Sequence, residues 1–239
     1  MSADLITGFD RHCRRDAHQS AVVWLDYTAP SQRPEQIREA VQLFGTLREH
    51  DVLRVTLNAS VYTLGTPPAQ IRPKERLDYL FQLLKEHLGD LLPYDASRGD
   101  MLADKFGDVL VRTIRKAFAT VTTGEPLPLV VNEYADGLHR MLTITVIKTT
   151  DAAKLRKRLA STPIENVPLD WNSQVLRLPE LSQLERARID EQLPPETTIS
   201  AIDARLGNFL DDDPLESTKI LAEYARFRSF YPAFARIFP

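Results

Sequence analysis

The chain has 239 residues, of which 43% are hydrophobic and 26% are charged, and its formal net charge is −3. This size suits one large domain, or one domain with an appendage. The small negative charge does not indicate a nucleic-acid partner, because a dominant phosphate-binding surface needs a clear basic excess. The single cysteine, Cys13, excludes an internal disulfide, and no apolar run is long enough for a signal-peptide core or a membrane span. We therefore expect a soluble, cytoplasmic protein.

The first 60 residues predict a helix followed by a strand–helix–strand unit. The helix covers residues 3–18 and carries Leu5, Ile6, Phe9 and Cys13 on one side. The apolar run at 21–25 predicts a buried strand, and residues 33–47 have the apolar spacing of a helix. A second strand covers 52–57. A unit of this size almost always places two parallel strands in one sheet.

Two helices are predicted next, over 74–92 and 101–121. A hairpin follows, with strands at 128–134 and 140–147 and Asp136-Gly137 as its turn. Beyond residue 151 the pattern indicates a charged helix, a short extended piece at 174–179, a helix from Ser182 and a last helix that Pro232 interrupts. We expect an α/β fold with a small, Rossmann-like, mostly parallel sheet ending in an antiparallel hairpin. Residues 1–150 form this domain, and residues 151–239 form a helical extension packed on it.

Polar residues follow the predicted strands at the places where ligands bind in open α/β sheets. Asp26 and Tyr27 end the first strand, and Asn58 ends the second. If the third strand is parallel to them, Tyr134 and Asp136 reach the same edge. Each residue type also suits a structural role, since acids cap turns and asparagine and Asp-Gly form them.

Acid–base and metal chemistry have few other candidates. Glu133 could pair with Asp26 as two carboxylates, although the sequence does not favour it. His139 is the one histidine close to the hairpin that we consider as a base, and none of the five histidines has metal-ligand spacing. The sequence contains neither a G-x-S-x-G elbow nor a phosphate-binding G-x-x-x-x-G-K-[ST] loop.

The segments "VVWLDYTAP", "VLRVTLNAS" and "EYADGLHRMLTITVI", with the later "LRLPELSQLERARIDEQLP" and "RFRSFYPAFARIF", resemble the second half of a bacterial O-methyltransferase family. The resemblance implies a fold of the class I S-adenosylmethionine-dependent type, in which the strand at 21–25 would be the fourth of seven. It implies that Asp26, Tyr27 and Asn58 face the cofactor or substrate. It also implies S-adenosylmethionine as the cofactor. The candidates for catalysis are then Asp26 and Asp136 in the crevice, with His139 added for its position near the hairpin.

One feature of that family type is missing from the sequence. A glycine-rich turn normally holds the cofactor, because backbone must approach it closely there. The chain has nine glycines, but no two are separated by a single residue. Either the chain is a truncated gene product, or it is a relative that has lost cofactor binding. The alternative function is a non-catalytic interaction or scaffold protein that keeps the degenerate sheet.

Two surfaces are candidates for protein partners. Half of such a sheet leaves an edge strand with unpaired backbone groups, which we expect the N-terminal helix or a homodimer to cover. The C-terminal aromatic stripe suits core packing first, a protein surface second and nucleic-acid stacking last. Its members are Tyr224, Phe227, Tyr231, Phe234 and Phe238.

Overall fold

The computed structural model describes residues 20–136, 139–161, 168–176, 183–192, 199 and 210–227. The chain forms two compact units, Met1–Val175 and Leu176–Pro239. The first contains β1 (Val22–Asp26), α2 (Arg33–Thr46), β2 (Val52–Asn58), α3 (Arg76–Leu88), α4 (Phe106–Phe118), β3 (Glu125–Asp136), β4 (His139–Thr149) and α5 (Ala152–Ala160). Strand β5 (Gln174–Leu176) spans the boundary, and the second unit contains α6 (Gln183–Gln192) and α8 (Pro214–Phe227). Short 3-10 helices in the first unit are η1 (Pro30–Gln32), η2 (Val61–Leu64), η3 (Pro73–Glu75), η4 (Gly89–Leu91) and η5 (Arg98–Met101).

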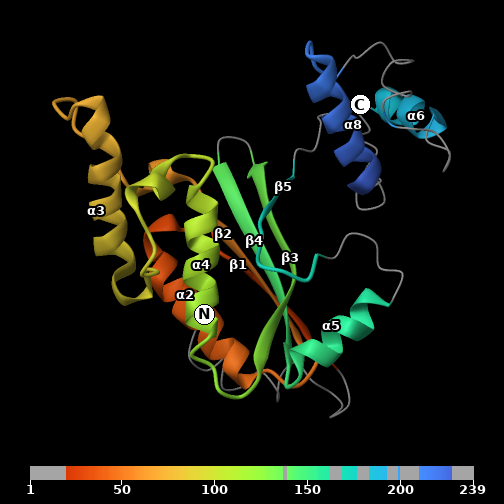
Figure 1. The fold of residues 1–239 in the computed structure, drawn as a ribbon, viewed down its shortest axis with the longest axis horizontal. Coiled ribbons are helices and arrows are strands. Elements are labelled where there is room, and N and C mark those ends of the chain that lie inside the picture. The colour runs from red at the N-terminus through yellow and green to blue at the C-terminus, as the bar shows by residue number, and fades with distance from the viewer. Residues whose placement is uncertain are drawn as a thin grey trace, which may run out of the picture. The chain divides into compact units, whose positions relative to one another are not determined.

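The five described strands form one sheet in the order β1-β2-β4-β3-β5 (Figure 1). Strand β1 pairs parallel with β2, and β4 pairs antiparallel with both β2 and β3. Strands β1, β2 and β3 therefore run in the same direction, and β4 runs against them between β2 and β3. The predicted α/β fold with a mostly parallel sheet and an antiparallel hairpin is confirmed. The hairpin closes with Asp136 opposite His139, and its two turn residues lie outside the described part.

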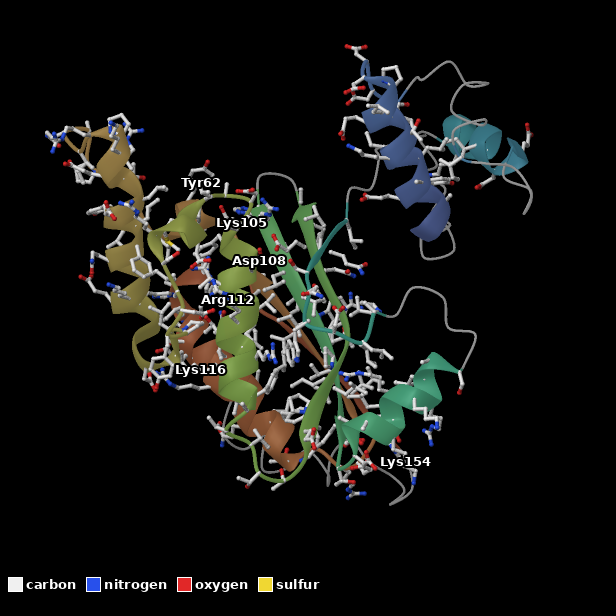
Figure 2. All side chains as sticks on the ribbon, in the orientation of Figure 1. Tyr62, Lys105, Asp108, Arg112, Lys116 and Lys154 are labelled. Atoms are coloured by element: carbon white, nitrogen blue, oxygen red, sulfur yellow. The ribbon has the colours of Figure 1, made fainter. Side chains whose placement is uncertain are left out.

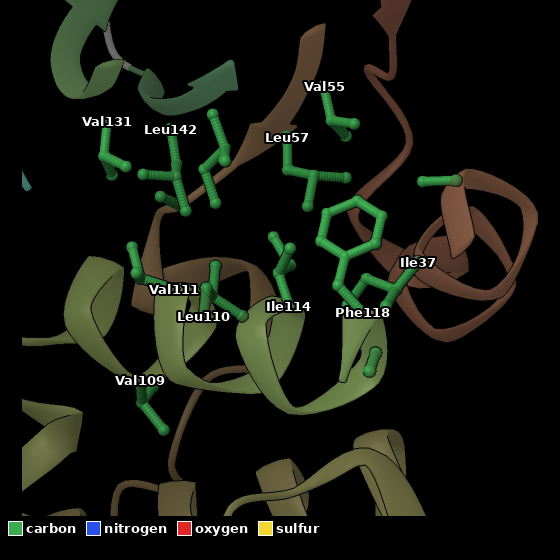
Figure 3. Close-up of a cluster of buried hydrophobic side chains, with 14 of the residues drawn as sticks. Ile37, Val55, Leu57, Val109, Leu110, Val111, Ile114, Phe118, Val131 and Leu142 are labelled. Carbon is green, nitrogen blue, oxygen red and sulfur yellow. The ribbon is translucent and has the colours of Figure 1, made fainter. Parts of the chain in front are cut away.

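Helices of the first unit cover one face of this sheet, with α2 and α4 in front of the strands (Figure 1). Helices α2 and α4 pack directly on it, and α3 lies on their far side. Helix α4 directs Leu110, Ile114 and Phe118 toward the sheet, whereas Val109 points to the opposite side of the helix (Figure 3). The phenylalanine rings of Phe118 and Phe44 join α4 to α2, with centroids 5.0 Å apart. Apolar residues at helical spacing thus become the core of the domain.

The end of α2 is held by a buried lysine from β4. The Nζ of Lys148 donates hydrogen bonds to the carbonyl oxygens of Phe44 (3.1 Å), Gly45 (3.0 Å) and Leu47 (2.7 Å). The last carbonyl groups of a helix lack partners further along it, and the helix dipole favours a cation at that end. Here the oxygen of Phe44 also accepts a hydrogen bond from the N–H of Leu47 at 3.2 Å. Burial lowers the pKa of Lys148. The lysine fixes the amino-terminal end of the sheet against α2.

Strand β3 begins earlier than the prediction of residue 128, and its pairing with β4 shifts register between Pro128 and Val130. Proline cannot donate to the ladder, which explains an irregularity at this point. The other predicted elements appear within a few residues of their expected bounds, and Gly89 follows the last residue of α3 as expected. The predicted helix over residues 3–18 lies outside the described residues.

In the second unit, Tyr224 of α8 packs with Ile189 of α6 and with Leu221. Its hydroxyl donates a hydrogen bond to the Oδ1 atom of Asp190 at 3.3 Å. The first residue of the predicted aromatic stripe is therefore a core residue, and the side chains of the later members lie outside the described part. Helix α5 and most of β5 belong to the first unit, which ends at Val175. Within the described residues, no helix combines the length and apolarity that a membrane crossing requires.

Candidate functional site

The carboxyl ends of three strands meet at one edge of the sheet, which we call the carboxyl edge. Asn58, the last residue of β2, is registered with Met141 of β4, and Met141 is registered in turn with Tyr134 of β3. Asp26, the last residue of β1, is registered with Thr56. The topology therefore brings together the strand ends on which the expected site depends.

The two residues at the end of β1 point to opposite faces of the sheet. Tyr27 turns toward the helices, and its hydroxyl donates a 2.8 Å hydrogen bond to the Oε2 atom of Glu39 in α2. Burial, together with this carboxylate, raises the pKa of Tyr27 above its usual range. Asp26 is exposed on the face away from α2 and α4, and no side-chain hydrogen bond ties it to another described residue. Of the two, only Asp26 has a functional group open to a ligand.

Asn58 is used by the turn that follows β2. Its side chain is buried, and its Oδ1 accepts hydrogen bonds from the backbone N–H of Ser60 (2.9 Å) and from Arg33 (3.5 Å). The Nε of Arg33 also donates to the backbone oxygen of Asn58 at 2.8 Å. The structure therefore gives Asn58 the turn-forming role that the sequence also allowed, with both oxygens occupied by neighbours.

Arg33 is a buried cation at this edge that the sequence did not single out. It begins α2, has no exposed surface, and lies over the ring of Phe106 at 5.5 Å. Burial lowers its pKa to about 10, and burial and the nearby Arg33 charge lower the pKa of His87. Within the described part, Arg33 Nη1 and His87 Nε2 are buried without hydrogen-bond partners. Arg33 thus joins the start of α2 to the loop after β2 and to the start of α4.

Glu133 forms a second buried charged group, on the helix-covered face of the sheet. Its side chain is 2% exposed, and the Nε of Arg140 donates to its Oε2 at 2.8 Å. Burial raises the pKa of Glu133, and Asp108 raises it further, while Arg140 and Ser173 oppose the rise. Ser173, which precedes β5, donates to Asp108 Oδ1 at 2.8 Å.

Glu133 and Asp26 do not form the carboxylate pair that the sequence left open. The ladder from Asp26 through Thr56 and Thr143 reaches Asn132, so that the face of Asp26 carries Asn132 and the opposite face carries Glu133. A signal for the true arrangement was present in the sequence. In a hairpin whose two-residue turn follows Asp136, Glu133 and Arg140 are diagonal neighbours on the same face of the sheet.

The hairpin end of the site is less defined than the strand ends. Asp136 is placed opposite His139, and for Asp136 only the backbone is described. His139 is exposed. In the described residues, no cluster of histidine, cysteine, aspartate or glutamate could hold a metal ion.

Large side chains stand exposed near the carboxyl edge. Tyr62 lies in η2, directly after β2, and is 77% exposed. Figure 2 shows Tyr62 and Lys105 at the end of the first unit where β3 ends and β4 begins. The backbone N–H of Ala59 donates to the Arg140 oxygen at 2.6 Å and fixes this loop to the hairpin. The edge therefore combines an exposed acid, Asp26, with an exposed aromatic ring.

The described strands and helices form an α/β fold with a mostly parallel sheet that ends in an antiparallel hairpin. A family model described as "Putative O-methyltransferase" matches residues 1–239, and the chain belongs to this family. The resemblance read from the sequence is thereby confirmed. Neither a curated protein nor a solved structure matches the chain.

Proposed function

We propose that this chain is an S-adenosylmethionine-dependent O-methyltransferase whose described residues supply the methyl-acceptor side of the site. The observation that carries the proposal is the carboxyl edge, where three strands of a family member end together and Asp26 presents an exposed carboxylate. Ligands of open α/β sheets bind at such an edge. Asp26 accepts a hydrogen bond from the acceptor hydroxyl and takes its proton, as a positioned base does in O–H chemistry.

The other residues at the edge act by positioning. The Arg33 side chain joins the start of α2 to the loop after β2, and Asn58 completes that loop. Tyr27 ties the end of β1 to Glu39 of α2. These contacts hold the backbone beside Asp26 in one arrangement, which is what general-base catalysis requires.

The described residues do not fit the cofactor's methionine end. That group needs a glycine-rich turn directly after a strand, and the sequence has no G-x-G. The described glycines with positive φ are Gly65, Gly89 and Gly124, and each stands alone. S-adenosylmethionine therefore remains the proposed cofactor through the family, without a binding site built from these residues.

Calorimetric titration of the full chain with S-adenosylmethionine and S-adenosylhomocysteine tests the proposal. Saturable heat with either ligand supports it, and the absence of binding at millimolar concentration overturns it. If binding occurs, Asp26→Asn should lower methyl transfer about 10²- to 10⁴-fold, the range for loss of a general base. Glu86→Gln, which changes an exposed acid on α3, is the matched control and should leave transfer unchanged.

A second function is favoured by the same residues. The hydroxyl of Tyr27 and the side-chain oxygen of Asn58 form hydrogen bonds inside the fold, and the glycine-rich turn is missing from the sequence. We propose as the alternative a non-catalytic interaction protein that uses the sheet as a scaffold. This function predicts no cofactor binding, so the same titration separates the two.

A further inference from the structure

Strand β1 is an edge strand of the described sheet, because β2 is its only described neighbour. The N–H of Val52 donates to the oxygen of Ala21 (2.9 Å), and the N–H of Tyr27 donates to the oxygen of Thr56 (3.0 Å). In a parallel ladder, alternate residues bond to the neighbouring strand. The odd-numbered residues of β1 therefore face β2, and Val22, Trp24 and Asp26 turn both their N–H and C=O groups away from it.

The side chains of these three residues form an ordered and exposed surface. Val22 is 76% exposed and Trp24 is 59% exposed, on the face away from α2 and α4. The indole of Trp24 is fixed in place, since its Nε1 donates to Thr56 Oγ1 at 3.0 Å and the guanidinium of Arg54 lies 5.2 Å from its ring centroid. Apolar side chains beside an unpaired strand edge are typical of a pairing surface.

We propose that the unpaired side of β1 joins two copies of the chain, with β1 pairing antiparallel to β1 of the second copy around a two-fold axis at Trp24. Val22, Trp24 and Asp26 lie two residues apart, with Trp24 in the middle. A two-fold axis at Trp24 therefore places these three residues opposite the same three residues of the second copy. Each Trp24 then faces Trp24 of the other copy, and each Val22 faces Asp26. Facing residues of this kind exchange both hydrogen bonds, which gives about six across the interface.

The distribution of charge favours this register and direction. In the antiparallel pairing the two Asp26 carboxylates stand four residues apart along the strand, which is roughly 14 Å. At that distance ordinary salt screens their repulsion. A parallel pairing of the same strands would place the two carboxylates side by side. Repulsion between the two Asp26 carboxylates therefore disfavours the parallel pairing but not the antiparallel one.

Disulfide trapping tests the register directly. In a full chain carrying Cys13→Ser, Val22→Cys and Asp26→Cys are introduced separately. The facing Cα atoms of a hydrogen-bonded pair are about 5.5 Å apart, within the range that a disulfide spans. We expect a mixture of the two variants to cross-link on oxidation and each variant alone not to. Failure of the mixture to cross-link, or equal cross-linking of either variant alone, overturns the proposed pairing.

Sedimentation of the full-length wild type tests the assembly itself. We expect a dimer, and we expect Trp24→Glu to raise its dissociation constant at least about 100-fold by placing two carboxylates on the axis. Tyr62→Glu, at another highly exposed aromatic residue, should leave the dimer intact. A dimer insensitive to Trp24→Glu overturns the proposal. So does a monomer whose amides at 22, 24 and 26 resist hydrogen exchange, because another part of the same chain would then cover the edge.

Discussion

Substitution of Gly107 by alanine should destabilise the protein, although alanine is normally the better helix former. Gly107 is the second residue of α4, and a Cβ built there would lie 2.5 Å from Oε2 of Glu133 and closer still to Oε1. The carboxylate has little room to move away, because its side chain is 2% exposed and Arg140 donates to Oε2 at 2.8 Å. Arg140 is itself fixed by its hydrogen bond to the oxygen of Ala103 (2.7 Å).

The size of the effect follows from three contributions. Overpacking a buried site costs about 1–3 kcal/mol. Separating the part-buried Glu133–Arg140 pair costs less than the roughly 3–5 kcal/mol that breaking a fully buried pair costs, because Arg140 is 29% exposed. Replacing glycine by alanine inside a helix returns about 1 kcal/mol. With the ion pair only partly displaced, we expect Gly107→Ala to lower the free energy of unfolding by about 2–4 kcal/mol.

Urea denaturation of Gly107→Ala beside Gly45→Ala gives the measurement and its control. Gly45 also lies in a helix, α2, but a Cβ built there meets no atom within 4 Å. Gly45→Ala should therefore leave stability unchanged or raise it by up to about 1 kcal/mol. A pair of identical substitutions with opposite effects would isolate the contact with Glu133.

A double-mutant cycle tests whether the Glu133 carboxylate causes the loss of stability. In a Glu133→Ala background the carboxylate is gone, so that Gly107→Ala should cost less than about 1 kcal/mol there. If Gly107→Ala costs the same in both backgrounds, the contact with Glu133 is not the cause. The contact is also excluded as the cause if Gly107→Ala lowers the free energy of unfolding no more than Gly45→Ala does.

Three further expectations concern the core, the end of α2 and the carboxyl edge. Phe118→Ala removes a fully buried ring and should lower the free energy of unfolding by about 3–5 kcal/mol in urea, with a smaller loss for the half-buried Phe81→Ala. Lys148→Met removes the donor to three carbonyls near the end of α2 and should cost about 1–3 kcal/mol in the same assay. Because burial and Arg33 lower the pKa of His87, the unfolded chain takes up the proton first as pH falls. The free energy of unfolding should thus decrease as pH drops below the ordinary histidine value of 6.5, and His87→Gln should reduce that slope.

Local patterns were sufficient for the elements and for their order along the chain. Apolar spacing predicted the helices that became α2 and α4, and Asp136-Gly137 predicted a hairpin whose strands close with Asp136 opposite His139. Helix and strand periods are properties of neighbouring residues, so one sequence can reveal them. The crossover indicated only that β1 and β2 are parallel. The direction of β3 was left open by the sequence and is fixed by its antiparallel pairing with β4, which in turn pairs antiparallel with β2.

The candidate site was less accessible from sequence, because its contacts join residues that are distant along the chain. Arg33 bonds to Asn58, 25 positions away, and nothing in the pattern of α2 distinguishes it from a solvent-facing arginine. Tyr27 and Asn58 were placed at the correct edge, but their hydrogen bonds to Glu39 and Ser60 could not be read from the sequence. The pairing of Glu133 with Arg140 was the exception, since the hairpin register contained it.

Local sequence patterns are enough to show that the chain folds as an α/β domain and that Asp26 ends its first strand. These properties depend on the alternation of apolar and polar residues, which acts over a few positions at a time. Only the folded structure shows which polar groups at the carboxyl edge are exposed and which form hydrogen bonds inside the fold. That outcome depends on packing, because a buried polar atom takes whichever partner the surrounding elements bring within reach. The surrounding elements leave the Asp26 side chain exposed, whereas the hydroxyl of Tyr27 and the side-chain oxygen of Asn58 form hydrogen bonds inside the fold.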